Sequence, residues 1–313
     1  MKQFLTLNDL QNFDAQVALA KEIKANPYQY EELGKRKTLG LLFFNPSLRT
    51  RLSTQKAGRL LGMDVMVMNF SNEAWAIEYE HETIMKGLRS EHVKEAAQVV
   101  SQYCDVVGIR AFATLTDKEK DESEQVLQKF IQYASVPILN MESATAHPLQ
   151  ALADALTLTE LSLPKKPKVV LTWAPHPKAL PHAVGNSFAR MMEHQDADFV
   201  IANPEGYDLD PRITKDIPVV HNQAEALKGA DVVYAKNWSS YDSYGQILRT
   251  DNEWMLTPEK MAATNNAAFM HCLPIRRNVV VSDSVLDSPN SKVIEQAKNR
   301  TFVAAAVLKT LLS

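Results

Sequence analysis

The sequence predicts an α/β protein built from two doubly wound parallel-sheet domains that are joined by a long helix. The chain has 313 residues, which is enough for two domains of ordinary size. Short apolar runs alternate with stretches of helical periodicity, the pattern of a parallel sheet with helices packed on it. This alternation begins again after a helical stretch near 145–160, which indicates a second sheet.

The first half alternates predicted strands with predicted helices. The strands are expected at 38–44, 64–70, 105–110 and 136–141, and the helices at 47–62, 92–103 and 123–134. After Thr38 the run at 38–44 is apolar, as in a strand with both faces buried. We expect Ser47 to cap the first helix, since serine accepts a hydrogen bond from the first turn, and Gly62 to end it.

The second half repeats the pattern. The strands are expected at 167–174, 198–204, 231–237 and 267–274, and the helices at 147–162, 180–195, 223–229 and 291–312. Gly229 closes the short helix, as glycine often does. Ligands of such sheets bind at the carboxyl ends of the strands, so the residues that follow each strand are the first candidates for a site.

The composition excludes several classes of protein. Hydrophobic residues make up 45% of the chain, which excludes a disordered protein. The chain has 34 basic and 37 acidic residues, and this balance argues against nucleic-acid or membrane partners. No apolar run is long enough to span a bilayer. The polar residues Asn8 and Asp9 occur before the apolar region of a signal peptide could form, so we expect no signal peptide. The chain has only two cysteines, which are too few for a disulfide framework. We therefore expect a cytoplasmic protein.

The first candidate site is the segment F-N-P-S-L-R-T-R at 44–51, which joins a strand to a helix. The start of a helix attracts anions, because its backbone N–H groups and dipole point toward them. Arg49 and Arg51 add positive charge at this helix start, where basic residues are usually disfavoured. An anionic ligand explains them; a solvated basic helix start is the alternative.

Two further candidates also follow strands. His147 and Gln150 are three residues apart at a helix start and can share one face. In H-C-L-P at 271–274, Cys272 is either a nucleophile or a small buried residue, and the second is favoured because no acylation motif surrounds it. Arg110 ends a strand and Arg300 lies in the otherwise apolar terminal helix. For each of them, a salt bridge is the alternative to a ligand contact.

The three motifs S-L-R-T-R, H-P-x-Q and H-C-L-P occur in an order that resembles the aspartate/ornithine transcarbamylase family over essentially the whole chain. The resemblance implies carbamoyl transfer without metal or organic cofactor, in a homotrimer with shared active sites. It implies a carbamoyl-phosphate domain of 1–144 plus 293–313, to which the last helix returns, and an amine-binding domain of 145–292. The implied carbamoyl-phosphate residues are Ser47, Leu48, Arg49, Thr50, Trp75, Arg110, His147, Gln150, Cys272, Leu273 and Arg300, of which Arg110, His147 and Cys272 are the catalytic ones.

The second half resembles one branch of this family. The S-M-G loop of ordinary ornithine enzymes is missing, and W-A-P-H-P-K-A-L-P at 173–181 and A-K-N-W at 235–238 are similar to the enzymes that act on N-acylated ornithines. In that branch these two loops form a trefoil knot. The resemblance implies that Glu142, His176 and Lys236 contact the acylornithine, and that Trp75 comes from the neighbouring subunit.

The acyl group is predicted from Ser90, which precedes Glu91 and His92. The resembling enzymes have glutamate there in the acetyl type and proline in the succinyl type. Serine removes the negative charge that would repel a succinyl carboxylate, and Arg276 can pair with that carboxylate. We therefore expect N-succinylornithine, with N-acetylornithine as the alternative. Aspartate and plain ornithine are weaker alternatives, and a non-catalytic carbamoyl-phosphate-binding paralogue is the alternative of another class.

Overall fold

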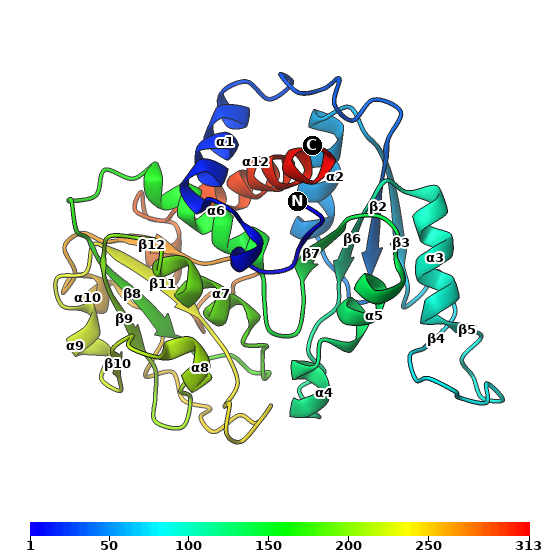
Figure 1. The fold of residues 1–313 in the computed structure, drawn as a ribbon. Helices are drawn as coiled ribbons and strands as arrows, with labels where there is room; N and C mark the ends of the chain where they lie inside the picture. The colour runs from blue at the N-terminus through cyan, green and yellow to red at the C-terminus, as the bar shows by residue number, and fades with distance from the viewer. The chain divides into compact units, whose positions relative to one another are not determined.

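The computed structural model describes all 313 residues and confirms an α/β fold with parallel sheets (Figure 1). The chain forms two compact units. Unit 1 comprises residues 1–114, 119–152 and 299–313, and unit 2 comprises 115–118 and 153–298. Each unit holds one five-stranded sheet in which all the strand pairs are parallel. None of the helices combines the length and the apolar character that a membrane crossing requires.

The sheet of unit 1 has the order β1-β7-β6-β2-β3. Its strands are β1 (Gln3–Phe4), β2 (Thr38–Phe43), β3 (Asp64–Asn69), β6 (Val106–Arg110) and β7 (Ile138–Glu142). The four predicted strands of the first half are confirmed. The edge strand β1 was not predicted, because two residues carry no readable periodicity. A separate pair, β4 (Ile77–Glu78) and β5 (Glu91–His92), was also not predicted.

Helices cover both faces of this sheet, as the alternation predicts. On one face, α3 (Val93–Tyr103) packs with α5 (Gln125–Tyr133) over a cluster that includes Leu42 and Ile109. On the other face lies α2 (Arg49–Leu60), where Gly58 comes so close to Leu39 that a Cβ atom would meet that side chain at 2.9 Å. The small residue therefore lets α2 pack tightly on β2.

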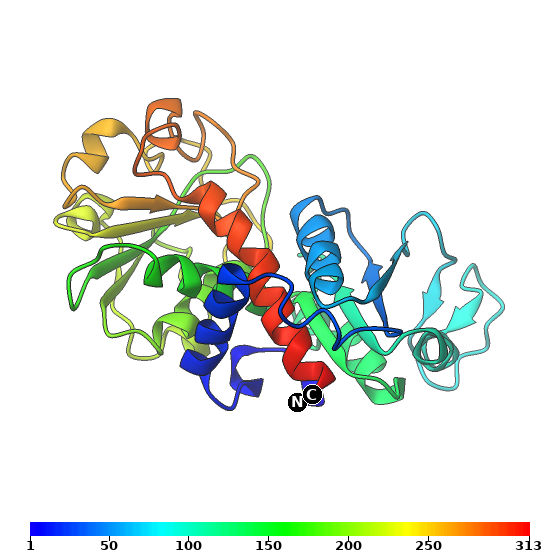
Figure 2. The ribbon, with the colours of Figure 1, turned by 90° about the horizontal axis from the view of Figure 1, so that it is seen from above.

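Two helices at the ends of the chain lie side by side in unit 1 (Figure 2). The N-terminal helix α1 (Phe13–Ala25) was not predicted, and the C-terminal helix α12 (Val293–Leu312) was. Lys24 donates to Asn299 at 2.7 Å, and the Thr310 hydroxyl donates to Gln16 at 3.2 Å. The last part of α12 is thereby fixed to the first unit.

Unit 2 has the strand order β10-β9-β8-β11-β12. Its strands are β8 (Lys168–Trp173), β9 (Asp198–Ala202), β10 (Val219–Val220), β11 (Val232–Lys236) and β12 (Ala268–Met270). Its longer helices are α6 (Pro148–Thr159), which begins in unit 1, α7 (Ala183–Met192) and α9 (Gln223–Leu227). The predicted strands and helices of the second half are confirmed.

The remaining short helices of the whole chain are η1 (Leu7–Asp9), α4 (Lys118–Glu122), α8 (Pro211–Thr214), α10 (Pro258–Met261) and α11 (Asp283–Leu286).

One local prediction is wrong. Ser47 does not cap α2, because the N-cap is Leu48, whose backbone is already helical, with φ −91° and ψ −60°. No side chain caps this helix. The backbone donors of its first turn therefore lack the serine acceptor that the sequence led us to expect.

Candidate active site

Two of the predicted site residues, Arg110 and Lys236, lie where the sheets reverse their direction of winding. In unit 1 the chain runs from β2 outward to β3 and then returns to β6 on the other side of β2. In unit 2 it runs from β8 through β9 and β10 and then returns to β11. The carboxyl ends of the strands beside such a reversal form the usual ligand crevice. Arg110 ends β6 and Lys236 ends β11, so the topology supports both as site residues.

Arg110 and Glu142 form a buried ion pair in unit 1. Nε and Nη2 of Arg110 both lie 3.2 Å from Glu142 Oε2. The register shifts between Ile109 and Arg110, and the shift places Arg110 opposite Glu142; such bulges often redirect side chains beside active sites. His147 Nε2 lies 3.3 Å from the same carboxylate oxygen. Three of the predicted residues thus share one cluster, which we call the Arg110 cluster.

Arg110 is buried near both a negative and a positive side chain. Burial lowers the pKa of Arg110, the carboxylate of Glu142 opposes that effect, and the positive charge of Arg49 lowers the pKa further. Two guanidinium groups therefore lie close enough to repel each other. Nη1 of Arg110 also donates to the backbone carbonyl of Pro46 at 2.8 Å, in the turn before α2. This arrangement favours an anion beside Arg49 and Arg110.

Arg300 connects three helices within unit 1. Its Nη2 donates to Thr50 Oγ1 at 2.6 Å, and its Nη1 donates to Gln150 Oε1 at 2.9 Å. All three side chains are almost fully buried, with 4%, 2% and 1% exposure for Arg300, Thr50 and Gln150. Residues that are 250 positions apart therefore meet at the start of α2.

The start of α2 carries the predicted phosphate ligands Ser47, Leu48, Arg49 and Thr50. Leu48 is 64% exposed, so its side chain has no packing role here, whereas its backbone forms the N-cap. The helix dipole adds a partial positive charge at this end. The helix dipole, the backbone donors of a first turn without a side-chain cap and the nearby guanidinium groups are chemically suited to a compact polyanion such as phosphate.

Trp75 and Ser90 lie on a different part of unit 1. Trp75 is 59% exposed, and its indole Nε1 donates to Glu91 at 2.5 Å. Ser90 is exposed, and its backbone N–H donates to Ala76 at 3.1 Å. The pairing of β4 with β5 thus brings Trp75 and Ser90 onto one exposed edge. The structure does not bring them into contact with the Arg110 cluster of their own chain.

Unit 2 brings together its predicted substrate residues His176, Lys236 and Arg276. Arg276 Nε donates to His176 Nε2 at 3.1 Å, and His176 Nδ1 lies 2.8 Å from the Lys178 carbonyl. These contacts fit a neutral imidazole with its proton on Nδ1. Burial lowers the pKa of His176, a hydrogen bond to the Lys178 backbone partly opposes this, and the charges of Lys236, Arg276 and Lys178 lower it further. The cations around His176 favour an anionic ligand.

The H-C-L-P segment follows β12 in unit 2. The Leu273 N–H donates to His271 Nδ1 at 2.9 Å, so this N–H is already used within the segment. Cys272 is buried, at 8% exposure. The His271 N–H donates to Gln296 Oε1 at 2.9 Å, and Gln296 Nε2 donates to Asp154 Oδ1 at 2.9 Å. Gln296 and Asp154 support the segment and were not predicted from the sequence.

A signal for these two residues exists in the sequence. Asp154 follows Gln150 by four residues in α6, and Gln296 precedes Arg300 by four residues in α12. Residues four apart lie on the same helix face. A polar residue one turn from a predicted ligand, on a face that is otherwise apolar, therefore marks a supporting position.

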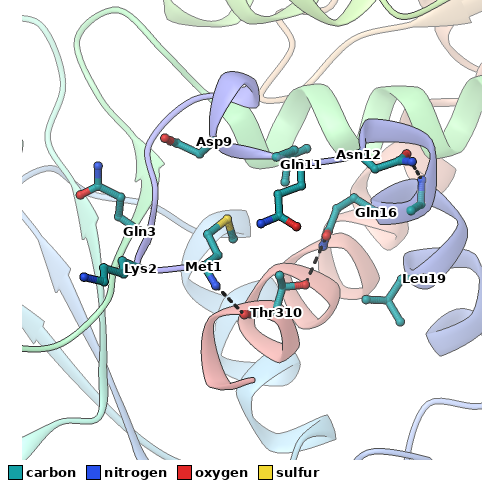
Figure 3. A pocket seen from close by; sticks show the side chains of 11 residues that line it. Met1, Lys2, Gln3, Asp9, Gln11, Asn12, Gln16, Leu19 and Thr310 are labelled. Carbon is teal, nitrogen blue, oxygen red and sulfur yellow. Dashed lines mark hydrogen bonds between the residues drawn. The ribbon is translucent and has the colours of Figure 1, made fainter.

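A separate cavity of about 480 Å³ lies between the N-terminal segment and α1 (Figure 3). Its lining includes Gln11, Asn12, Gln16 and Thr310, and none of the predicted site residues. The Gln16 side chain in this cavity accepts a hydrogen bond from Thr310 (Figure 3). No group of three or more His, Cys, Asp or Glu side chains is arranged to hold a metal ion.

The chain matches known proteins over its full length. N-succinylornithine carbamoyltransferase of Bacteroides thetaiotaomicron is 50% identical, over 100% of this chain and 99% of that protein. N-acetylornithine carbamoyltransferase of Xanthomonas campestris is 38% identical, over 100% of this chain and 98% of that protein.

A crystal structure of a glutamate-to-serine variant of N-acetyl-L-ornithine transcarbamylase, complexed with carbamyl phosphate and N-succinyl-L-norvaline, is also similar. It is 38% identical, with a TM-score of 0.91, and the match covers 99% of this chain and 100% of that one.

Two family models account for most of the sequence. Residues 2–160 match the carbamoyl-P binding domain of aspartate/ornithine carbamoyltransferase, and residues 182–311 match its Asp/Orn binding domain. The resemblance seen in the three motifs is thereby confirmed, and the chain belongs to the aspartate/ornithine carbamoyltransferase family.

Proposed function

We propose that this protein transfers the carbamoyl group of carbamoyl phosphate to the δ-amine of N-succinyl-L-ornithine, giving N-succinyl-L-citrulline and phosphate for arginine biosynthesis. The observation that carries the proposal is the convergence of Arg110, His147, Gln150 and Arg300 beside the start of α2. The names of the full-length relatives support the same activity.

Carbamoyl phosphate would bind at the carboxyl ends of β2 and β6. The first turn of α2, with Ser47, Leu48, Arg49 and Thr50, would hold the phosphate group. Arg110 and His147 would donate to the carbamoyl oxygen, and Gln150 would hold the carbamoyl amide. Arg300, which already contacts Thr50 and Gln150, would fix both ends of this cradle.

The chemistry follows from these donors. The neutral δ-amine attacks the carbamoyl carbon, so the new C–N bond forms as negative charge develops on the carbamoyl oxygen. The C–O bond to phosphate then breaks, and phosphate leaves with the electron pair and takes up the proton that the amine loses. Donors fixed in advance around the developing charge lower the barrier, and cations near the attacking nitrogen favour its neutral form.

The acylornithine would be bound by residues of unit 2 together with Glu142. His176 and Lys236 would contact its amino-acid end, and the backbone of Cys272 and Leu273 would receive the amine. We propose the functional division of the sequence analysis, with 1–144 plus 293–313 for carbamoyl phosphate and 145–292 for the acylornithine.

The charge around His176 favours the succinyl substrate. N-succinylornithine carries two carboxylates, whereas N-acetylornithine carries one. Lys178, Lys236 and Arg276 all place positive charge near His176, and arginine binds a carboxylate in a fixed geometry. Ser90 supports the same choice, since we propose that it corresponds to the glutamate replaced by serine in the variant that was complexed with N-succinyl-L-norvaline.

Turnover of carbamoyl phosphate with N-succinylornithine, followed by the release of phosphate and of the ureido product, tests this function. A non-catalytic paralogue would bind carbamoyl phosphate in calorimetry and release no phosphate. The presence of the whole Arg110 cluster favours the enzyme, because a paralogue that only binds has no need of an oxygen-directed arginine and histidine at the carbamoyl end.

Ser90→Glu should shift the preference toward N-acetylornithine. The new carboxylate would repel the succinyl carboxylate and leave the acetyl group unaffected. We expect the ratio of kcat/KM values, succinyl over acetyl, to fall by about 10-fold, which corresponds to about 1.4 kcal/mol. Ser90→Gln is the matched control, since it adds similar bulk without charge. An unchanged ratio in Ser90→Glu would remove Ser90 from the acyl site.

We further propose a homotrimer with shared active sites. Trp75 and Ser90 lie on an exposed edge and belong to the predicted site, so a neighbouring subunit can supply them. Mixing inactive Trp75→Ala protein with inactive Arg49→Ala protein should restore about a quarter of the activity at equal amounts, because random exchange gives one site in four both intact residues. No recovery after demonstrated subunit exchange would contradict sharing.

Two finer features are also proposed. The loops 173–181 and 235–238 would form a trefoil knot. Their close association is supported by a hydrogen bond from Asn237 to the Ala174 carbonyl at 2.8 Å, and by one from the N–H of Ser239, just after the second loop, to the Leu180 carbonyl at 3.0 Å. A reducing cytoplasm is proposed because Cys104 and Cys272 are both buried and neither forms a disulfide.

A further inference from the structure

A tight turn separates two residues of the Arg110 cluster. Glu142 ends β7 and His147 precedes α6, and the chain between them folds back so that the Ser143 N–H donates to the Ala146 carbonyl at 2.8 Å. Ser143 and Ala144 are buried, with Ser143 at 2% exposure, whereas Thr145 and Ala146 are partly exposed. Its shape sets where Glu142 and His147 lie, because they stand at its two ends.

The carboxylate of Glu124 binds this turn from outside. Glu124 Oε1 accepts from the Thr145 N–H at 2.8 Å, from the Thr145 hydroxyl at 2.6 Å and from the Ser143 hydroxyl at 2.8 Å. Glu124 Oε2 accepts from the Ala144 N–H at 3.2 Å. One carboxylate therefore satisfies donors from three consecutive residues, and buried donors of this kind are costly to leave without an acceptor.

Glu124 also has an unusual backbone conformation. Glu124 has φ 52° and ψ 38°, in the left-handed region that residues other than glycine rarely occupy. It stands at the N-cap of α5, yet its side chain makes no capping hydrogen bond there. The side chain reaches the turn instead of its own helix. Strained residues of this type often occur where function fixes the geometry.

We infer that Glu124 is a positioning residue for carbamoyl transfer, which acts by holding the turn 143–146 so that His147 keeps its place beside Glu142 and Arg110. The inference rests on the proposed function. Glu124 would not touch either substrate; it would act through the turn alone. Removal of the Glu124 carboxylate should therefore lower the rate of the chemical step strongly. It should weaken the binding of the phosphate group much less, because we propose that α2 holds that group.

The test compares Glu124→Ala with the wild-type protein and with Glu119→Ala, a control that removes the same charge from an exposed position five residues earlier. We expect kcat to fall by about 10- to 100-fold, as small misplacements of a catalytic group do. We expect the calorimetric Kd of carbamoyl phosphate to change by less than about 3-fold, since the phosphate ligands lie on another element. Glu119→Ala should match the wild type.

A double-mutant cycle separates positioning from simple destabilisation. If Glu124 acts through His147, Glu124→Ala should cost less than about 2-fold in kcat when His147→Asn is already present. An equal loss in both backgrounds would overturn the inference, as would a folded Glu124→Ala protein with the kcat of the wild type. If wild type itself turns over none of the acylornithines, the proposed function fails rather than this inference.

Glu124→Gln keeps the test decisive if the alanine variant does not fold. The glutamine oxygen can replace Oε1 and keep its three bonds, while the amide nitrogen faces the Ala144 N–H and loses the fourth. We expect a folded protein with a smaller loss of kcat, about 3- to 10-fold, and an unchanged Kd of carbamoyl phosphate. A folded Glu124→Gln protein with the kcat of the wild type would contradict the inference.

Discussion

Arg49→Ala should weaken carbamoyl phosphate binding by at least about 30-fold, because a charge-assisted contact to a doubly negative phosphate contributes about 2 kcal/mol or more. Arg49 is the first residue of α2, and its charge already acts on Arg110. Removing it takes away one of the cations that make this helix start suitable for an anion. Isothermal titration calorimetry with carbamoyl phosphate measures the effect directly.

Stability should change little in Arg49→Ala, because Arg49 is partly exposed and such arginines contribute modestly to folding. Arg59→Ala is the matched control, since it removes the same charge from the exposed end of the same helix. It should bind carbamoyl phosphate as the wild type does. Equal affinities in both variants would show that α2 does not hold the phosphate.

Arg110→Met should abolish turnover and also destabilise the protein by about 3 kcal/mol, the cost of leaving one partner of a buried ion pair without its counterion. The value is at the lower end of that range because His147 remains beside Glu142. Activity is lost because the carbamoyl oxygen loses its cationic donor. Urea denaturation at a fixed protein concentration measures the stability, and phosphate release measures the activity.

The double variant Arg110→Met with Glu142→Gln separates these two effects. Neutralising Glu142 removes the buried charge that Arg110 had balanced, so most of the lost stability should return. Activity should not return, since the oxygen-directed donor is still missing. If the double variant is as unstable as Arg110→Met, the ion pair is not the source of the loss.

Much of the fold could be predicted because its elements are long and periodic. The strand predicted at 38–44 is apolar after Thr38, and the terminal helix has a clear amphipathic pattern. These patterns indicate the type of each element. The edge strand β1 pairs only Gln3 and Phe4 with β7, and two residues have no period. Its place depends on a partner more than 130 residues away, which local patterns do not record.

The candidate site was predictable for a related reason. Arg110, His147 and the start of α2 all follow strands, and parallel strands bring their carboxyl ends to one edge. Glu124 and Gln296 could not be found this way, because they act through turns and backbone groups that exist only in the folded chain. Ser47 shows the converse error: its side chain suits a cap, yet the helix begins after Leu48.

The most direct test of the account is a comparison of kcat/KM for N-succinyl-L-ornithine, N-acetyl-L-ornithine and L-ornithine, each with saturating carbamoyl phosphate. We expect the highest value for N-succinylornithine, by about 10-fold or more over the acetyl compound, because only the succinyl group presents a second carboxylate to Arg276. A higher kcat/KM for N-acetylornithine or for ornithine would contradict it.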